Sequence, residues 1–281
     1  MNTFGTPRKL VYLKKILKEM GSTLVAFSGG VDSAFLLKVA SDVLKDRVVA
    51  VIALSATYPP KEAKAAEEIC RRFGLRYTTI ETDELNNSDF TSNSIKRCYY
   101  CKRELFSKLL EVARENDLNF VSEGSNHDDL KDFRPGMKAI KELGVRSPLL
   151  ESKLTKDEIR QLSKEMGLST WDKPSFACLS SRFPYGTTIT PEELIKVSRA
   201  EEFLAGIGFK QLRVRVHGCV ARIEILKEDM PLLLKDGVRD QMVKKMKGLG
   251  YSYVTMDLEG YRTGSMNEVL KGLDEWTETR S

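Results

Sequence analysis

The sequence predicts an α/β protein whose larger first part is a doubly wound, mostly parallel sheet, followed by a smaller α+β domain. Short apolar runs alternate with segments of helical periodicity up to about Pro184, and this alternation is typical of parallel sheets covered by helices. One run, at residues 47–54, is apolar almost throughout, as in a strand buried on both faces. Beyond Pro184 the pattern changes to helix, two strands, helix and strand.

Local signals predict the elements in chain order. Thr6-Pro7 predicts the start of a helix that runs to Met20 and ends at Gly21, because proline suits the first helical position and glycine the end. The other elements of the first part are a strand at 24–27, a helix at 34–44, a strand at 47–54, a helix at 60–73, a strand at 76–80, a helix at 102–116 and a strand at 119–122. The second part contains a helix at 190–205, strands at 211–216 and 220–226, a helix at 236–248 and a strand at 251–258. A loop rich in Pro, Gly and Thr predicts a boundary between domains at residues 1–185 and 186–281.

The composition is that of an ordinary globular protein, since 41% of the 281 residues are hydrophobic and 30% are charged. The 45 lysines and arginines exceed the 40 acidic residues by +5, and this surplus is dispersed, whereas nucleic-acid readers usually concentrate their basic residues. No apolar stretch approaches the roughly 18 residues that span a bilayer, and the start of the chain lacks the apolar core of a signal peptide. We therefore expect a cytoplasmic protein with no nucleic-acid or membrane partner.

The most informative segment is Ser28-Gly-Gly-Val-Asp-Ser33, between an expected strand and an expected helix. Glycines let the backbone approach an anion closely, and a helix N-terminus offers unpaired N–H groups and a positive dipole end. Asp32 is unfavourable beside bare phosphate but suits a Mg²⁺ ion that bridges carboxylate and phosphate. The common phosphate loop G-x-x-x-x-G-K-[ST], with its lysine, is absent, as is G-x-G-x-x-G. Out of context, a turn that caps a helix would be the better explanation.

In this context the segment resembles the PP-loop of the ATP pyrophosphatases, enzymes that split ATP into AMP and pyrophosphate. The resemblance implies that ATP adenylates a substrate oxygen, which a nucleophile then displaces. It also implies that the end of the next strand, at residues 53–57, holds the adenine. The implied ATP-binding residues are Ser28, Gly29, Gly30, Asp32, Ser33, Ser55 and Gly124.

The five cysteines favour metal ligands or reactive thiols over disulfides, because we expect a reducing compartment. Cys98 and Cys101 form a C-x-x-C pair just before an expected helix, and such a pair can share a metal or form a redox disulfide. Cys178 lies in a loop rich in Pro and Ser, where the charges of Lys173 and Arg182 favour a thiolate. Beside a nucleotide site, these three thiols suggest a cubane iron–sulfur cluster with one open iron.

The alternative to a cluster is a redox pair and an unrelated thiol. Cys70 falls on the apolar side of an expected helix, and Cys219 follows the hairpin turn. We interpret both as structural thiols.

Six blocks together resemble the LarE family, the ATP-dependent sulfur transferases that build the nickel-pincer cofactor of lactate racemase. The blocks are residues 28–33, 123–129, 134–136, 173–175, 178–182 and 260–267, which span nearly the whole chain. The resemblance implies that ATP adenylates a carboxylate of pyridinium-3,5-biscarboxylic acid mononucleotide, which turns its oxygen into a good leaving group before sulfur enters. It also implies a substrate-binding C-terminal domain and a homo-oligomer, either a trimer or a hexamer.

The resemblance assigns roles to further residues. Cys178, Glu201 and Glu224 match positions near the reacting centre, and Arg182, Arg213 and Arg262 match positions whose guanidinium groups grip the substrate phosphate. Asp128 and Asp129 match positions that help to bind Mg²⁺. Without the resemblance, Glu201 is equally well a solvated helix charge, Arg213 and Glu224 a cross-strand pair, and the two aspartates helix caps or loop residues.

The source of the sulfur distinguishes two branches of the family. In the sacrificial branch, the cysteine at the Cys178 position gives up its own sulfur and becomes dehydroalanine. In the other branch, Cys98, Cys101 and Cys178 would bind a [4Fe-4S] cluster whose open iron carries an extra sulfide, replenished by sulfide or another sulfur donor. We favour the cluster because the C-x-x-C pair is present.

Three other functions fit parts of the sequence. A PP-loop tRNA thiolation enzyme can also use three cysteines, but it predicts an RNA-binding domain and a concentrated basic face. An amide-forming synthetase needs an ammonia source and no cysteine trio. A non-catalytic ATP-binding or iron–sulfur carrier module would not need an intact loop beside a candidate nucleophile.

Overall fold

The computed structural model describes residues 5–131, 135–174 and 177–269. The chain forms two compact units, Met1–Phe176 and Ala177–Ser281, here called the N-terminal and C-terminal units. The boundary predicted at residue 185 lies inside the second unit and stays a prediction. Each unit is described by itself.

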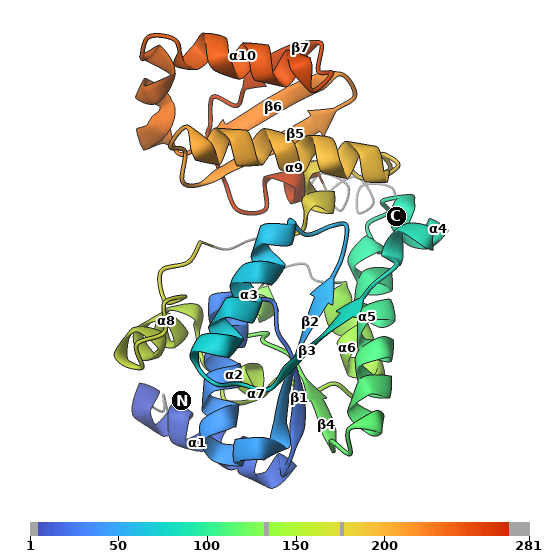
Figure 1. The fold of residues 1–281 in the computed structure, drawn as a ribbon, viewed down its shortest axis with the longest axis vertical. Helices are drawn as coiled ribbons and strands as arrows, with labels where there is room; N and C mark the ends of the chain where they lie inside the picture. The colour runs from blue at the N-terminus through green and yellow to red at the C-terminus, as the bar shows by residue number, and fades with distance from the viewer. Residues whose placement is uncertain (1–4, 132–134, 175–176, 270–281) are drawn as a thin grey trace, which may run out of the picture. The chain divides into compact units, whose positions relative to one another are not determined.

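The N-terminal unit is built on a parallel sheet of four strands in the order β3-β2-β1-β4. The strands are β1 at Thr23–Ala26, β2 at Val48–Leu54, β3 at Tyr77–Glu81 and β4 at Phe120–Ser122. β2 reads Val-Val-Ala-Val-Ile-Ala-Leu and its first five residues are buried, as the continuous apolar run predicts. The predicted α/β fold is therefore confirmed (Figure 1).

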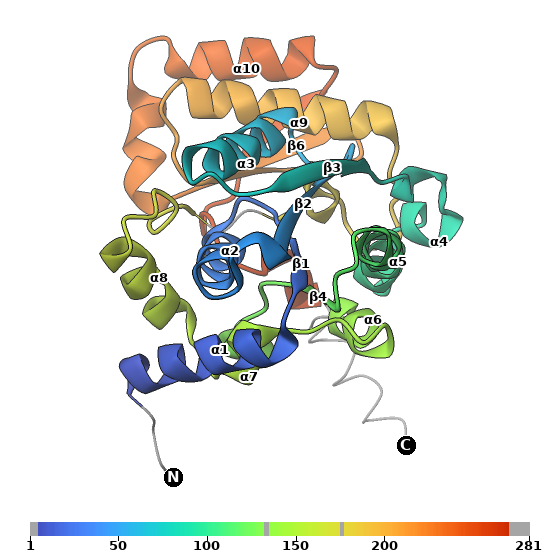
Figure 2. The same ribbon diagram turned by 60° about the horizontal axis from the view of Figure 1, so that its bottom comes forward.

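Helices cover both faces of this sheet (Figure 2). The helices are α1 at Thr6–Met20, α2 at Val31–Leu44, α3 at Pro60–Arg72, α4 at Ser88–Thr91, α5 at Arg97–Glu115, α6 at Gly136–Glu142, α7 at Pro148–Glu151 and α8 at Lys156–Glu165. One core joins β1 and β2 to α1, α2, α3, α7 and α8, and a second core joins β1, β2 and β4 to α5 and α6. Because all the strands run the same way, their carboxyl ends open at one edge, where ligands bind in folds of this class.

Helix α5 begins earlier than the sequence predicts, so Cys98 and Cys101 lie inside its first turns and not before them. The prediction was wrong here because the buried apolar residues of α5 begin only at Phe106, so its first two turns give no apolar helical pattern. Helix α8 begins at a capping box, in which Thr155 accepts from the backbone of Glu158 and the Glu158 carboxylate accepts from the backbone of Thr155. The capping box fixes the first residue of α8, Lys156, and with it the backbone position from which the Lys156 side chain extends.

The C-terminal unit has a sheet of three strands in the order β5-β6-β7, with β5 and β6 antiparallel and β6 and β7 parallel. Its elements are α9 at Pro191–Gly206, β5 at Leu212–His217, β6 at Val220–Ile225, α10 at Val238–Gly248 and β7 at Tyr253–Met256, in the predicted order. Helix α9 packs against β5, and α10 packs against α9 and β7.

The hairpin of β5 and β6 has one apolar and one charged face, because side chains alternate along a strand. Val214 pairs with Ile223 on the apolar face, whereas Arg215 pairs with Arg222 on the other. Residues 212–216 are all buried, so the charged side of β5 is covered as well. In the described part of the chain, no helix is both long and apolar enough to cross a membrane.

Candidate functional site

The Ser28–Ser33 segment joins the end of β1 to the start of α2, as the sequence predicts. The hydroxyls of Ser28 and Ser33 lie 3.0 Å apart, and the Ser28 N–H donates to Ser33 Oγ at 3.3 Å. Among the described residues, no side chain caps the first turn of α2. The N–H groups at this helix start therefore remain available to an anion.

The two glycines of the loop have different roles. Gly29 adopts a φ of +69°, and a Cβ there would lie 3.0 Å from the Ala66 Cβ of α3. Gly30, the N-cap of α2, has an ordinary φ of −82°, and of the described atoms a Cβ there would meet only Ser28 Oγ, at 3.4 Å. Gly29 is thus required by the fold. Gly30 is not, but its lack of a side chain leaves room beside Ser28 Oγ, so that a ligand could contact the loop backbone closely.

Asp32 lies in the first turn of α2 and is held by two partners. The ammonium of Lys156 forms an ion pair with one carboxylate oxygen, and the amide of Asn126 donates to the other at 3.3 Å. The Asp32 and Lys156 side chains keep 21% and 26% of their surface exposed. The carboxylate therefore remains accessible to a cation.

A second ammonium lies against the same loop. Lys173 Nζ donates to the Gly29 carbonyl at 3.1 Å and to the Glu62 carboxylate of α3 at 2.8 Å. In the sequence, Lys173 is expected near Cys178 and belongs to one of the blocks that resemble the LarE family. In the structure it adds positive charge to the nucleotide loop.

The segment after β4 supports this loop. A Cβ on Gly124 would lie 3.0 Å from Ser33 N, so glycine is required for this close approach. Asp128 accepts from the Lys156 N–H at 2.9 Å, and Asp129 accepts from the Asn126 N–H at 2.9 Å. Both aspartates thus have the loop and capping contacts considered above, and their Mg²⁺ role stays a prediction.

Ser55 follows β2, where the PP-loop resemblance implies adenine binding. Its hydroxyl and that of Thr57 both contact the Glu84 carboxylate, which is 3% exposed. The Thr57 N–H also donates to Ser55 Oγ at 3.0 Å. The buried Glu84, which the sequence did not single out, therefore anchors the turn at the end of β2.

Cys98 and Cys101 lie on one side of α5, since residues three apart on a helix are neighbours. Cys98 is exposed and Cys101 is half-buried. Arg97 Nη2 lies 4.0 Å from Cys98 Sγ. Within either unit, the described residues contain no group of three or more His, Cys, Asp or Glu side chains placed to hold a metal ion.

The two thiols predicted to be structural differ in their surroundings. Cys70 is fully buried in the core, and burial raises the pKa of its thiol to about 11, with Glu67 adding to the effect. Cys219 is exposed in the turn between β5 and β6. The structural interpretation therefore fits Cys70, whereas Cys219 adds nothing to the core.

In the C-terminal unit, Arg182 holds the segment that carries Cys178. Its side chain is 0% exposed and forms a bidentate ion pair with Glu201, with Nε 2.9 Å from Oε1 and Nη2 2.8 Å from Oε2. It also donates to the carbonyls of Ala177 and Cys178, at 2.7 and 3.0 Å. The Glu201 carboxylate accepts from Val214 N as well, which caps the outer edge of β5. Arg182 thus positions the backbone at Cys178, and its phosphate role stays a prediction.

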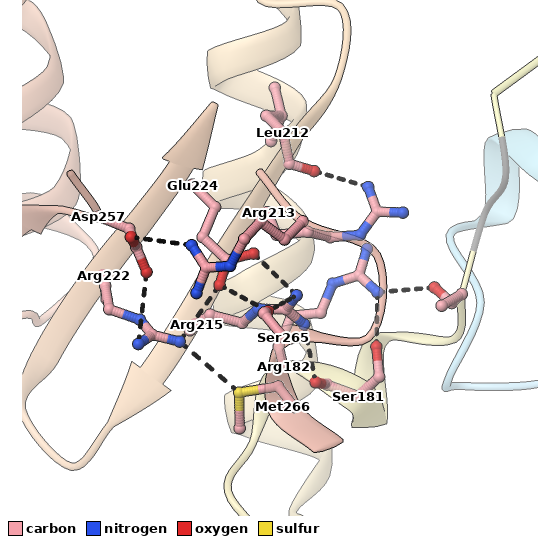
Figure 3. A network of polar contacts seen from close by, with 12 residues as sticks. Ser181, Arg182, Leu212, Arg213, Arg215, Arg222, Glu224, Asp257, Ser265 and Met266 are labelled. Carbon is pink, nitrogen blue, oxygen red and sulfur yellow. Dashed lines mark hydrogen bonds and ion pairs between the residues drawn. The ribbon is translucent and has the colours of Figure 1, made fainter. Parts of the chain in front are cut away.

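The charged face of the hairpin forms a network around Glu224 (Figure 3). Glu224 is 0% exposed and accepts from Arg215 at 2.8 Å, from Arg222 at 3.2 Å and from the Ser265 hydroxyl at 3.0 Å. Arg215 also donates to the Ser181 carbonyl at 3.0 Å, which joins the network to the Cys178 segment. The Nε atoms of Arg215 and Arg222 are buried and have no acceptor among the described residues.

Arg213 and Arg262 contact residues other than Glu224. Arg213 lies opposite Glu224 in the strand register, but it donates to the Leu212 carbonyl at 2.6 Å and stacks on Tyr261 at 5.2 Å. Burial lowers the pKa of Arg213, and the nearby charge of Arg182 lowers it further. Arg262 pairs with Asp257 at 3.4 Å and with two glutamates, and its hydrogen bonds with Glu268 raise its pKa.

The structure adds functional candidates that the sequence analysis missed: Asn126, Lys156, Arg215 and Arg222. Alternation along β5 and β6 already placed Arg215 and Arg222 on the charged face, so that signal was available. Lys156 lies 124 residues from its partner Asp32, and no local pattern reports such a pair. Of the resembling blocks, Arg134 and Ser175 lie outside the described residues.

Comparisons with known proteins agree with this geometry. Residues 8–104 match the family model described as NAD synthase. The chain is 44% identical over 262 residues to an uncharacterized protein of Synechocystis sp., covering 93% of this chain and 98% of that protein. It is 38% identical over 271 residues to the pyridinium-3,5-bisthiocarboxylic acid mononucleotide synthase of Lactiplantibacillus plantarum, covering 96% and 97%. It is 29% identical over 259 residues to an uncharacterized protein of Methanocaldococcus jannaschii, covering 91% and 98%.

Proposed function

This chain belongs to the LarE family, and from that premise we propose that it is an ATP-dependent sulfurtransferase of nickel-pincer cofactor biosynthesis. Its substrate is pyridinium-3,5-biscarboxylic acid mononucleotide, in which a carboxylate becomes a thiocarboxylate. The observation that carries the proposal is the 38% identity to the Lactiplantibacillus plantarum synthase over 96% of this chain. We further propose that it acts as a homo-oligomer, a trimer or hexamer.

The first step takes place at the Ser28–Ser33 loop. A carboxylate oxygen of the substrate attacks the α-phosphorus of ATP, and the bond from that phosphorus to the β-bridging oxygen breaks, giving an acyl adenylate and pyrophosphate. The open N–H groups at the start of α2 and the hydroxyls of Ser28 and Ser33 bind phosphate oxygens. Asp32 is accessible and suits Mg²⁺, which would offset phosphate charge when bound.

The second step replaces AMP by sulfur. A sulfur nucleophile attacks the acyl carbon, a C–S bond forms and the C–O bond to AMP breaks. The charged face of the C-terminal unit supports binding of the substrate phosphate, because buried Nε–H groups of Arg215 and Arg222 have no acceptor among the described residues. Arg182 and Ser181 hold the Cys178 carbonyl, which keeps the thiol-bearing segment in one conformation.

The arrangement of the cysteines supports a proposal for the sulfur source. Cys98 and Cys101 fit a shared cluster, since one face of a helix start presents both and Cys98 is exposed. We propose that these two thiolates and Cys178 hold a [4Fe-4S] cluster, which would supply the sulfide sulfur when bound.

Substrate-dependent exchange of labelled pyrophosphate into ATP tests the first step. Wild-type protein is expected to exchange label only when the biscarboxylic substrate is present, and Asp32→Asn is expected to lose the exchange. Exchange that does not depend on this substrate would contradict the proposed substrate, and no exchange with any carboxylate would contradict the activity.

Iron and acid-labile sulfide analysis of anaerobically purified protein tests the sulfur source. About four irons per chain are expected, lost in Cys98→Ser, Cys101→Ser and Cys178→Ser but kept in the exposed control Cys219→Ser. If reconstituted protein holds no iron, the cluster is excluded. A mass loss of about 34 Da after one turnover, from H₂S leaving Cys178 as dehydroalanine, would then identify that cysteine as the donor.

A further inference from the structure

The nucleotide loop lacks the lysine that ordinary phosphate loops carry, yet two lysines from distant parts of the chain lie against it. Lys156 is 124 residues from its partner Asp32, and Lys173 is 144 residues from its partner Gly29. A triphosphate carries several negative charges, and the loop itself contributes none of the positive side chains that would offset them. The fold therefore supplies the cations by long-range contacts.

Lys156 is held in a position that α8 alone would not favour. It is the first residue of α8, where the helix dipole disfavours a cation. Its N–H is fixed by the Asp128 carboxylate at 2.9 Å, and its side chain reaches out to Asp32. The contacts thus aim the ammonium at the loop.

The side chain of Lys173 contacts the backbone of the loop. Its ammonium donates to the Gly29 carbonyl at 3.1 Å and to Glu62 at 2.8 Å, and 26% of its side-chain surface is exposed. Among the described residues, the Lys173 ammonium has one carbonyl and one carboxylate as acceptors, which leaves its third N–H available. The cation is therefore both fixed beside the loop and able to take another acceptor.

We propose that Lys156 and Lys173 bind the β- and γ-phosphates of ATP and stabilise pyrophosphate as it leaves. This inference rests on the proposed function. When the bond from the α-phosphorus to the bridging oxygen breaks, its electron pair stays on that oxygen, and the two ammonium groups offset the charge that develops there. In the protein without ATP, Asp32 and Glu62 offset the charges of these two lysines, and a cation bound at Asp32 would leave Lys156 free to contact the phosphates.

The inference predicts selectivity between nucleotides. AMP has no β- or γ-phosphate, so its binding does not use the two lysines, whereas α,β-methylene-ATP and pyrophosphate do. Isothermal titration calorimetry with these three ligands and Mg²⁺ therefore isolates the lysine contribution. The variants are Lys156→Met and Lys173→Met, with Lys164→Met, an exposed lysine at the other end of α8, as the matched control.

Each variant is expected to bind α,β-methylene-ATP and pyrophosphate about 10- to 100-fold more weakly, as is typical for the loss of a hydrogen bond to a charged group. Affinity for AMP is expected to change by less than about twofold, and the control to match the wild type. Lys156→Arg keeps the charge and is expected to recover part of the loss. A merely structural role would instead weaken all three ligands together.

The outcomes separate this inference from the proposed function. If wild-type protein binds α,β-methylene-ATP and pyrophosphate and the two variants bind them equally well, the lysine inference is overturned while the activity stands. Equal losses for AMP and pyrophosphate overturn it too. If wild-type protein binds no nucleotide at all, the proposed function fails, and the inference fails with it.

Discussion

The two units hold their positive charges in different ways. Lys156 and Lys173 of the N-terminal unit keep 26% of their side-chain surface exposed, and each ammonium pairs with one carboxylate. Arg182 and Arg215 of the C-terminal unit are 0% and 6% exposed, and each donates to a backbone carbonyl and to a carboxylate, Glu201 with 11% and Glu224 with 0% of its side chain exposed. A flexible ammonium exchanges partners easily, whereas a buried guanidinium cannot leave its partner without stranding a charge.

This difference suits different ligand tasks. Pyrophosphate must be bound and then released, so half-exposed lysines with replaceable partners suit the nucleotide loop. The segment at Cys178 must keep its conformation through the reaction, so buried arginines bonded to its carbonyls suit the C-terminal unit. Substitution of the arginines should therefore mainly lower the stability of the protein. Substitution of the lysines should mainly lower its affinity for ligand.

The largest expected effect is on stability, from Arg182→Ala. Its loss strands Glu201 and the carbonyls of Ala177 and Cys178, so the free energy of unfolding is expected to fall by about 3–5 kcal/mol. The matched control is Arg262→Ala, because this arginine has a side chain 27% exposed and pairs near the surface, which predicts a loss below about 1 kcal/mol. Urea unfolding followed by far-UV circular dichroism measures both. Equal losses would remove the contrast between buried and exposed guanidinium groups.

The next effect separates the two loop glycines. Gly29→Ala is expected to lower the free energy of unfolding by about 1–2 kcal/mol, since its φ of +69° disfavours a Cβ and Ala66 stands in the way. Gly30→Ala is expected to cost less than about 1 kcal/mol but to weaken ATP binding, because its methyl group would lie 3.4 Å from Ser28 Oγ, one of the proposed phosphate ligands. Thermal unfolding and calorimetry on both variants test this, and a Gly30→Ala protein with normal ATP affinity would contradict close backbone contact.

A smaller stability effect is expected at the lysines. Lys156→Met removes a half-exposed pair and leaves Asp32 bonded to Asn126, so the free energy of unfolding is expected to change by about 0–1 kcal/mol. Urea unfolding of wild type and variant at low and high salt measures the contribution of the Lys156–Asp32 pair to the free energy of unfolding, and high salt should reduce this contribution. A loss comparable to that of Arg182→Ala would show that the ammonium is a fixed structural group and would end the comparison.

The same contrast explains how much the sequence could predict. Periodicity predicted the parallel sheet and the β5–β6 hairpin, since both follow from neighbouring residues. The loop pattern predicted Gly29 beside a helix start. Lys156 and Lys173 could not be found this way, because each depends on a contact more than a hundred residues away (124 and 144). Nor could sequence tell that Arg182 would be buried against Glu201, because only packing decides exposure.

The smallest expected effect is a titration that reports the charged face. Partial burial lowers the pKa of His217, and the charges of Arg222 and Arg215 lower it further, so its imidazole is expected to titrate below 6.5. The folded protein therefore favours the neutral ring. The contribution of His217 to the free energy of unfolding is fully present at a pH above the pKa of the unfolded chain, and it is lost as the pH falls through that pKa towards the lower pKa of the folded protein. The chain has two histidines, so proton NMR follows each ring, and His217→Gln identifies the signal.

The proposed substrate-phosphate site makes this titration diagnostic. A phosphate that binds Arg215 and Arg222 offsets their charge, so the pKa of His217 is expected to rise when inorganic phosphate or a pyridinium mononucleotide is added. Arg222→Gln should raise it without ligand and reduce the further rise on binding. A His217 signal that ligand leaves unmoved, while the ligand demonstrably binds, would place the phosphate away from this face. In that case the buried arginines would serve only to hold the Cys178 segment.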